Sequence, residues 1–475
     1  MNKAFKIAYA SVFLAICATP LILMPFVTGN AEIEKKELTA MPSLIKDGSL
    51  NNDFSTEFES WFNDRLPLRS ELLSAADFVK SEVFSSPASN VITGSDGWLF
   101  FNDEKKDYMD TNALSERQLR SSAVTVSLLE EYVTSRGGRF VFVPMPNKAS
   151  VYGEYMPSCY TMSRMNNLSR LCAELDKLEV NYVDMKQVLT DNKDQGVYHK
   201  RDTHWNYLGA LIGYNAIMDK LGADHRTYGG ASYEYKKDWR ADLDKLLYPS
   251  SGFMDYQYHF DIEYQPFRFS APAGITDEQE ALASFMSDKE ENDIRITAQN
   301  EGDAANERLY MVRDSFGRAL LPFMIDNYEK SMFVRADNPD MSMASEGGDM
   351  VYEIVERNIS RIAAKAPYMF APEREGFEIP AVGGEVEKTV CTDEGYAVRL
   401  YGKLPEGKLT DGRTYVTLTQ NGTTRTFEAF PICEKELEGD RGFSMYLSPD
   451  LGLEGEYELT VTADGVAYSG GKITV

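Results

Sequence analysis

Two short stretches of the sequence hold side chains whose types and spacing suit acyl-transfer chemistry. The first carries Asp202 and His204, a carboxylate and an imidazole two residues apart, and an apolar segment typical of a helix follows it. The second lies far downstream, where an apolar run ends at Asp314 and Ser315. A serine hydroxyl is a weak nucleophile at neutral pH, so it needs a base within hydrogen-bond reach and a third group that orients that base. The two stretches together contain all three groups.

His204 is the best candidate for the base. The chain has four histidines, and only His204 has both a nearby acid and a predicted helix start directly after it. In an extended backbone, Asp202 and His204 point to the same side, so the carboxylate can reach Nδ1 while Nε2 faces a substrate. Ser315 follows a predicted strand, as a nucleophile elbow would, although the Gly-x-Ser-x-Gly pattern is absent. The Ser315 amide and Asn147 are candidate donors to an oxyanion.

The same residues have structural interpretations. Asp202 could cap the helix that begins near Trp205, and Asp314 with Ser315 is a good helix N-cap pair. His199, Asp202 and His204 could also approach a metal ion, but a catalytic zinc needs three protein ligands and an open position. We therefore predict neither a metal nor a cofactor.

The surrounding chain predicts an α/β domain. Phe140 to Val143 is a short continuous apolar run, which suits a strand buried on both faces. Asn147 and Lys148 follow it, at the end of a strand where open α/β sheets bind ligands, although a solvated turn is the alternative. The alternation of elements favours a mostly parallel sheet. Strands are predicted at 140–143, 180–183 and 309–312, and helices at 115–135, 167–179, 205–221 and 317–327.

The pattern of residue types along the chain predicts three regions. Residues 1–30 form a membrane anchor or signal segment, 31–370 the α/β domain and 371–475 a β-sandwich, because short strands separated by turn residues replace the helical periodicity. Within the α/β domain, the alternating stretch Tyr256 to Tyr264 is expected to pair with Asp293 to Ala298 as a ribbon that covers the rim of the site.

Charge and the N-terminus bear on the compartment. The net charge of -25 argues against a nucleic-acid partner, because such proteins present basic surfaces. The uncharged run from Ile7 to Val27 is long enough to span a bilayer, which takes roughly 20 residues. The lysines before it predict that the rest of the chain lies outside the cytoplasm. Cleavage near Ala31 is the alternative. Four cysteines beyond this run permit two disulfides in an oxidising compartment, Cys159 with Cys172 and Cys391 with Cys433. Free thiols are the alternative.

These motifs carry a family resemblance. Asp202-Thr203-His204-Trp205 followed by Gly209-Ala210, with Asp314-Ser315-Phe316 downstream, resembles the SGNH-hydrolase-like proteins of alginate O-acetylation and the related DHHW family. Three other stretches resemble the same group: Gly97-Trp98-Leu99-Phe100, Pro146-Asn147-Lys148 and Asn63 to Arg69. The likeness spans roughly residues 32–365. Thr203 stands where DHHW proteins have His, and Arg313 stands where SGNH enzymes usually have Gly.

The resemblance implies a fold and an activity. The fold is a three-layer α/β/α sandwich in which Asp-x-His precedes Ser. Ser315 would be the acyl-accepting nucleophile, His204 its base and Asp202 the orienting acid. The remaining candidates for oxyanion or substrate binding are Asn147, Lys148, Arg313 and Trp205.

Three functions remain open on this basis. The first is a membrane-anchored, extracytoplasmic polysaccharide O-acetyltransferase, for which the resemblance implies a membrane-bound O-acyltransferase partner that exports acetyl groups. The second is a carbohydrate acetylesterase with the same residues, in which water is the acceptor. The third is a non-catalytic carbohydrate-binding or assembly component.

Overall fold

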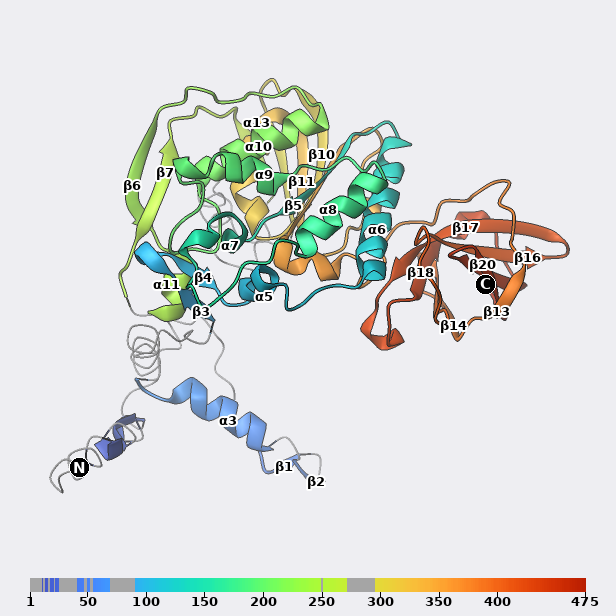
Figure 1. The fold of residues 1–475 in the computed structure, drawn as a ribbon, viewed down its shortest axis with the longest axis horizontal. Coiled ribbons are helices and arrows are strands. Elements are labelled where there is room, and N and C mark those ends of the chain that lie inside the picture. Colours follow the sequence, from blue (N-terminus) through green and yellow to red (C-terminus); the bar gives the residue numbers. More distant parts are fainter. Residues whose placement is uncertain are drawn as a thin grey trace. The chain divides into compact units, whose positions relative to one another are not determined.

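The chain divides into two compact units (Figure 1), formed by residues 1–93 with 240–254 and by 94–239 with 255–475. This computed structural model describes residues 11, 13–15, 18–20, 22–24, 41–46, 49–51, 54–68, 90–248, 251–270 and 295–475. The predicted anchor at 1–30 lies mostly outside these ranges. Within them, no helix has the length and the apolar character needed to cross a membrane.

The first unit contains few regular elements. Strands β1 (Ile45–Lys46) and β2 (Ser49–Leu50) pair in antiparallel fashion, and helix α3 (Phe54–Arg65) follows them. The rings of Phe54 and Phe58, one turn apart on α3, stack at 5.8 Å. Helix α11 (Asp242–Leu247) contacts strand β3 (Val91–Thr93).

A mixed six-stranded sheet forms the centre of the second unit. Its first four strands are parallel: β5 (Phe140–Met145), β12 (Asp349–Val355), β10 (Asn306–Arg313) and β11 (Tyr328–Arg335). Strand β9 (Arg295–Asn300) is antiparallel to β11, and β8 (Phe267–Ser270) is antiparallel to β9. Every residue of β5 and β12 is buried, as the continuous apolar run at 140–143 predicted for the former. The predicted strand at 180–183 contributes only a single bridge between Tyr182 and β5.

Two long helices share a core with this sheet. Helix α6 (Glu116–Thr134) starts at a capping box between Ser115 and Gln118, and α8 (Asn167–Lys177) starts at Asn166. Their apolar residues form one cluster with those of β5, β10 and β12. Helix α10 (Tyr207–Leu221) contacts β5, and α13 (Leu321–Asn327) contacts β11. Shorter helices are α5 (Glu104–Met109), α7 (Lys148–Val151) and α9 (Met185–Asp191).

The expected ribbon exists with a different partner. Strand β7 (Asp255–Phe260) pairs with β6 (Tyr233–Trp239), whereas residues 295–300 form β9 in the central sheet. The predicted pairing of 256–264 with 293–298 was therefore wrong. The reason is that Ile296 and Ala298 on β9 are buried when that strand extends the sheet beyond β11.

The C-terminal region is all β, as predicted, and its eight strands form one curled sheet. The order is β13-β20-β19-β16-β17-β18-β15-β14, and a long central strand, β17, pairs with β16 through residues 423–429 and with β18 through 430–432. Asn421 and Gly422 both have positive φ in the turn between β16 and β17, as a tight hairpin turn of this kind requires. The bounds are β13 (Val382–Glu385), β14 (Lys388–Asp393), β15 (Val398–Lys403), β16 (Thr414–Gln420), β17 (Thr423–Ile432), β18 (Gly442–Leu447), β19 (Glu456–Ala463) and β20 (Val466–Thr474).

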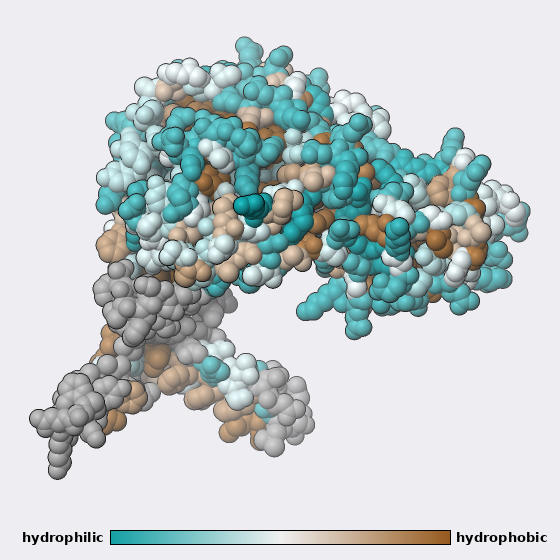
Figure 2. All heavy atoms as spheres, in the orientation of Figure 1, coloured by the Kyte–Doolittle hydropathy of each residue, from teal (hydrophilic) through white to brown (hydrophobic). Residues whose placement is uncertain are grey.

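The curled sheet encloses its own core and also contacts α6. Its enclosed core includes Leu418, Val461 and Phe443, whereas Phe430 and Ile432 on β17 join the core formed with α6. The division at residue 370 stays a prediction. Figure 2 shows that hydrophilic residues dominate the visible face of the second unit, consistent with the net charge of -25.

The proposed disulfides are absent from the structure. Cys159, Cys172, Cys391 and Cys433 are free thiols. Cys159 is exposed while Cys172 packs against the core of the central sheet. Cys391 packs against the core enclosed by the curled sheet, whereas the Cys433 amide bonds to the Ala363 carbonyl outside it. Each predicted pair therefore has its two thiols in different environments.

Candidate active site

Two chain segments meet at the carboxyl end of β10. The first is the loop before α10, whose start is fixed by the Asn206 side chain, which accepts a hydrogen bond from the Gly209 amide at 3.0 Å. The helix cap is thus Asn206 and not Asp202, which leaves the Asp202 carboxylate for other partners. The second segment is the exit from β10, where Ser315 precedes the short 3-10 helix Phe316–Leu320 without donating or accepting a capping bond through its side chain.

The structure brings Ser315, His204 and Asp202 into one chain of hydrogen bonds. His204 Nε2 lies 2.8 Å from Ser315 Oγ, and Nδ1 lies 2.7 Å from Asp202 Oδ1. The His204 backbone amide also donates to Asp202 Oδ1 at 3.0 Å. Asp202 is buried, while the His204 side chain keeps 21 % of its surface exposed and Ser315 is half-buried. A proton can pass from Ser315 to His204 in this arrangement, because the carboxylate stabilises the imidazolium that forms.

Asp202 has a further partner that the sequence did not reveal. The indole Nε1 of Trp239, the last residue of β6, donates to Asp202 Oδ2 at 2.9 Å. The Trp239 ring stacks on the ring of His199, with centroids 5.0 Å apart and planes 6° from parallel. Burial lowers the pKa of His199, and its Nδ1 lies 2.9 Å from the Tyr256 carbonyl. His199 therefore packs on the Trp239 ring, whose indole donates to the acid.

The exit from β10 is tied to the end of β12 through Asp314. Asp314 accepts hydrogen bonds from the amides of Phe316 and Val355, both at 2.8 Å, and its own amide donates to Glu353 at 3.0 Å. Ser315 has ordinary right-handed helical dihedrals, φ −69° and ψ −24°, so this turn lacks the strain of a nucleophile elbow. A substituent on Gly317 would lie 2.7 Å from the Arg313 side chain, which explains why glycine occupies that position.

Lys148 holds the loop that carries the acid. The residue is fully buried, and its predicted role in substrate binding stays a prediction. Its Nζ donates to the carbonyls of His199 at 3.2 Å, Lys200 at 3.1 Å and Asp202 at 2.5 Å. A buried ammonium is tolerated only when its hydrogens are bonded, and three carbonyls from one loop satisfy it.

Arg313 and Trp205 are also buried, and Trp205 links the two segments. Trp205 Nε1 donates to the Phe316 carbonyl at 3.0 Å, and Arg313 Nη1 donates to the Asp314 carbonyl at 3.0 Å. A Cβ on Gly213 would lie 2.4 Å from the Trp205 ring, so α10 packs directly on this side chain. Both residues thus lie in the buried support of the candidate site, and their predicted contact with substrate stays a prediction.

Asn147 lies in a buried polar network. Its amide nitrogen Nδ2 donates to Asp107 at 3.1 Å, and its backbone amide donates to Glu356 at 2.8 Å. Burial, and then the charge of Asp107, raise the pKa of Glu356 to about 7, and burial also raises the pKa of Asp107. The Asn147 side chain therefore has structural partners, and its role as an oxyanion donor stays a prediction.

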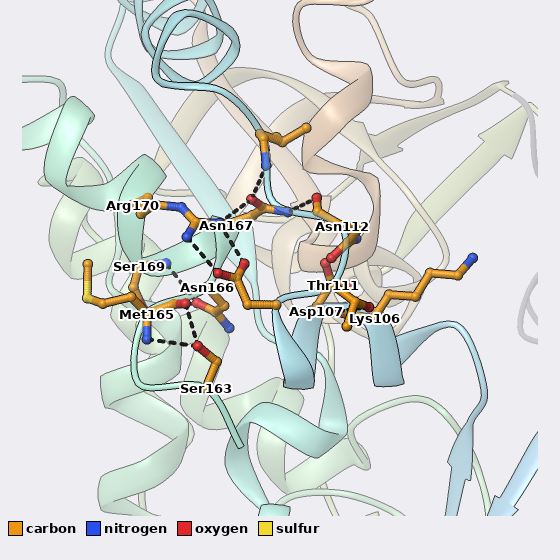
Figure 3. A network of polar contacts seen from close by, with 12 residues as sticks. Lys106, Asp107, Thr111, Asn112, Ser163, Met165, Asn166, Asn167, Ser169 and Arg170 are labelled. Atoms are coloured by element: carbon orange, nitrogen blue, oxygen red, sulfur yellow. Dashed lines mark hydrogen bonds and ion pairs between the residues drawn. The ribbon is translucent and has the colours of Figure 1, made fainter. Parts of the chain in front are cut away.

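Neighbouring segments brace this network. Asn166, the cap of α8, donates to Glu356. Asn112 donates to Asp107 at 2.9 Å, and Figure 3 shows these two residues among their neighbours. Arg357, next to Glu356, lies 3.5 Å from Asn147 Oδ1, with its guanidinium carbon 5.6 Å from the centre of the Phe316 ring. The Phe316 ring in turn lies 4.9 Å from the His204 ring. Sequence reasoning missed Arg357 as a cation beside the site, although it follows directly after β12.

Known proteins resemble parts of this chain. Residues 91–246 match the family described as SGNH hydrolase-like domain, acetyltransferase AlgX. That range includes Asp202 and His204 and ends before Ser315. The probable alginate O-acetylase AlgJ of Pseudomonas aeruginosa is 28% identical over 182 residues, 37% of this chain and 44% of that protein. The corresponding Pseudomonas putida protein is 24% identical over 223 residues, 46% of this chain and 54% of that protein.

The chain thus spans about half the length of the curated relatives it matches. A solved structure of Bacillus cereus PatB1 is 16% identical and has a TM-score of 0.45, with 57% of this chain and 96% of that chain covered. A DHHW family protein from Eubacterium siraeum is 16% identical, with a TM-score of 0.39 and coverage of 51% and 86%. The match of residues 91–246 to the SGNH hydrolase-like domain family of AlgX confirms the resemblance drawn from the motifs.

Proposed function

We propose that this chain is a polysaccharide O-acetyltransferase in which Ser315 is the nucleophile, His204 the general base and Asp202 the orienting acid. The observation that carries the proposal is the unbroken hydrogen-bond chain from Ser315 Oγ through His204 to Asp202. The names of the relatives, probable alginate O-acetylases, support acetyl transfer to a polysaccharide as the reaction class.

The first half-reaction would form an acetyl-serine. Ser315 Oγ attacks the acetyl carbonyl carbon of the donor while His204 Nε2 takes the hydroxyl proton. Collapse of the tetrahedral intermediate breaks the bond to the leaving group, which receives that proton. The backbone amide of Ser315 is the proposed donor to the oxyanion.

The second half-reaction would run the same steps with a sugar hydroxyl as the nucleophile. His204 takes the proton of the sugar, the new ester bond forms, and Ser315 Oγ recovers its proton from His204. We propose that the chemistry takes place outside the cytoplasm, with residues 1–30 as a membrane anchor or cleaved signal. A membrane-bound O-acyltransferase that exports acetyl groups would then supply the donor.

A chemical test uses the purified full chain with an activated acetyl ester and a set of oligosaccharides. Mass spectrometry should find an added acetyl group on the peptide containing Ser315, and then on the sugar. The variants Ser315→Ala and His204→Ala should lose both products, whereas Ser135→Ala, at an exposed serine on the end of α6, should keep them.

The outcomes separate the three functions. Acetate release without acetylated sugar would assign water as the acceptor and make the protein an esterase. Turnover that is unchanged in Ser315→Ala or His204→Ala would end the catalytic proposal and leave a binding or assembly role.

A further inference from the structure

Three neighbouring parallel strands end beside the candidate active site, and each is followed by a polar residue at the same spacing. Strands β5, β12 and β10 lie next to one another in that order and run in the same direction. Asn147 stands two residues beyond the end of β5, Arg357 two beyond β12 and Ser315 two beyond β10. The carboxyl ends of parallel strands meet at one edge of a sheet, where open α/β sheets bind their ligands. Arg357 therefore follows the strand next to that of the nucleophile, at the same edge.

Two aromatic rings hold the Arg357 guanidinium at this edge. Its carbon Cζ lies 5.7 Å from the centre of the Phe101 ring and 5.6 Å from the centre of the Phe316 ring, within the range of cation–π contacts. Phe316 directly follows Ser315 in the chain, and its ring also lies 4.9 Å from the His204 ring. One ring thus contacts both the base and the arginine, so the cation is fixed relative to the segment that carries the nucleophile.

Asn147, on the third strand end, is less accessible than Arg357. Its side chain is 1 % exposed, and Nδ2 donates to Asp107 at 3.1 Å. Its Oδ1 lies 3.5 Å from Arg357 Nη1, which makes a long hydrogen bond between the two side chains. Arg357 itself is only half-buried. A bound substrate can therefore reach the guanidinium more readily than the amide.

The backbone before Arg357 is anchored, while its charge has no close counterpart. The buried carboxylate of Glu356 accepts hydrogen bonds from the Asn147 amide at 2.8 Å and from Ser150 Oγ at 2.7 Å. Arg357 forms no ion pair with any residue that the structure describes. A cation that starts from a fixed backbone and has no carboxylate beside it can bind a negative charge that develops in the site, with little reorganisation.

We propose that Arg357 is a catalytic residue of the acetyl transfer assigned to Ser315, and that its guanidinium donates hydrogen bonds to the acetyl carbonyl oxygen. The inference rests on the proposed function. When Ser315 Oγ attacks the carbonyl carbon, the electron pair of the π bond moves onto this oxygen. When the tetrahedral intermediate collapses, that pair forms the carbonyl again and the bond to the leaving group breaks.

Arg357 and the Ser315 amide then share the binding of the oxyanion. Hydrogen bonds between charged groups are roughly twice as strong as those between neutral groups. The guanidinium therefore stabilises the oxyanion more than the neutral carbonyl of the substrate, which is the difference that lowers a barrier. Its loss should accordingly lower kcat and leave KM nearly unchanged.

Hydrolysis of 4-nitrophenyl acetate by the purified full chain measures both constants. This substrate carries no carboxylate, so an effect of Arg357 cannot come from pairing with an acid on the substrate. Arg357→Met should lower kcat by about 100- to 1,000-fold, the usual loss for one oxyanion donor. Arg357→Lys keeps the charge without the forked donors and should retain an intermediate rate. The matched control is Arg361→Met, which changes an exposed arginine at the end of the same 3-10 helix and should keep the wild-type rate.

Chemical rescue separates the charge from packing. Arg357→Ala should regain part of its activity when guanidinium chloride is added at concentrations too low to unfold the protein. Urea has nearly the same shape without the charge, and it should restore far less. Neither compound should restore Ser315→Ala, which lacks the nucleophile.

The outcomes distinguish this inference from the function on which it rests. Full activity in Arg357→Met, an equal loss in Arg361→Met, equal rescue by urea, or a raised KM with unchanged kcat would overturn the role of Arg357. In each of these cases the wild type still turns over through Ser315, so the proposed function stands. A wild type without turnover, or Ser315→Ala with unchanged turnover, would overturn the proposed function and the role of Arg357 together. Thermal unfolding midpoints of all variants establish that each is folded.

Discussion

The hydrogen bond from Trp239 to Asp202 gives a sharp test of how the site works. The Asp202 carboxylate accepts hydrogen bonds from the His204 amide, from His204 Nδ1 and from Trp239 Nε1. Trp239→Phe removes the last of these while leaving an aromatic ring to stack on His199. If Asp202 orients the base, the loss of this bond frees the carboxylate to rotate and weakens its hold on His204.

The size of the effect follows from the geometry. The bond is 2.9 Å long, and its acceptor is a buried carboxylate. Hydrogen bonds to charged groups contribute about 1.5 to 3 kcal/mol. Because each 1.4 kcal/mol changes a rate by about a factor of ten, we expect kcat to fall by about ten- to one hundredfold. KM should change little, since Trp239 contacts the acid and is not proposed to touch substrate.

Release of nitrophenolate from 4-nitrophenyl acetate, followed by absorbance, measures both constants. The matched control is Trp98→Phe, because the buried Trp98 indole nitrogen has no hydrogen-bond partner within the described part of the chain. That variant makes the same change in ring size without breaking such a bond, and it should keep most of the activity. A Trp239→Phe enzyme as active as the wild type would refute the role given to Asp202, and an equal loss in Trp98→Phe would trace the effect to packing.

Two further predictions concern stability. Lys148→Met leaves three loop carbonyls without their donor, so the free energy of unfolding, measured with urea, should fall by about 3 kcal/mol or more. The control is Lys106→Met, which changes an exposed lysine. An equal change in both variants would contradict the role given to Lys148. Glu356, whose pKa is raised from 4.5 to about 7, binds its proton more tightly in the folded state. Its contribution should therefore be most favourable below about pH 4.5 and decline by about 3 kcal/mol as the pH rises through 7. Urea unfolding at pH 5 and pH 8 should show a smaller pH dependence in Glu356→Gln, and identical dependence in both proteins would contradict this.

The sequence predicted that Asp202, His204 and Ser315 would meet, because their placement depends on local pattern. The two-residue spacing of Asp202 and His204 constrains which atoms can meet, and a buried strand that ends before Ser315 sets the hydroxyl at the edge of the sheet. The parallel part of the sheet was likewise predictable from its continuous apolar runs. The similarity of residues 91–246 to the AlgX family was accessible from the same motifs.

Tertiary contacts account for what was missed. Nothing local to Lys148 shows that its ammonium turns inward, because a buried lysine and a solvated one have the same neighbours in sequence. The partner of β7 was assigned wrongly because two alternating strands were matched by pattern alone, without the competing edge at β11. The cysteine pairs were inferred from proximity along the chain, which says nothing about the side of a sheet on which each thiol lies.

The most informative of these omissions is Trp239. It reaches Asp202 only because β6 pairs with β7, while the loop around Asp202 is fixed by Lys148 from the far end of β5. Two separate segments thus support Asp202, with Trp239 at its carboxylate and Lys148 at its backbone carbonyl, although a motif search finds only Asp202 itself. Rigid support of this kind is what an orienting acid requires, since an imidazole held in one geometry loses no energy to reorganisation during proton transfer. If the bond from Trp239 orients Asp202 as the geometry implies, variants of Trp239 should lower kcat while substrate binding, measured as KM, stays unchanged. The motif residues alone would not predict this effect, because Trp239 lies outside the motif.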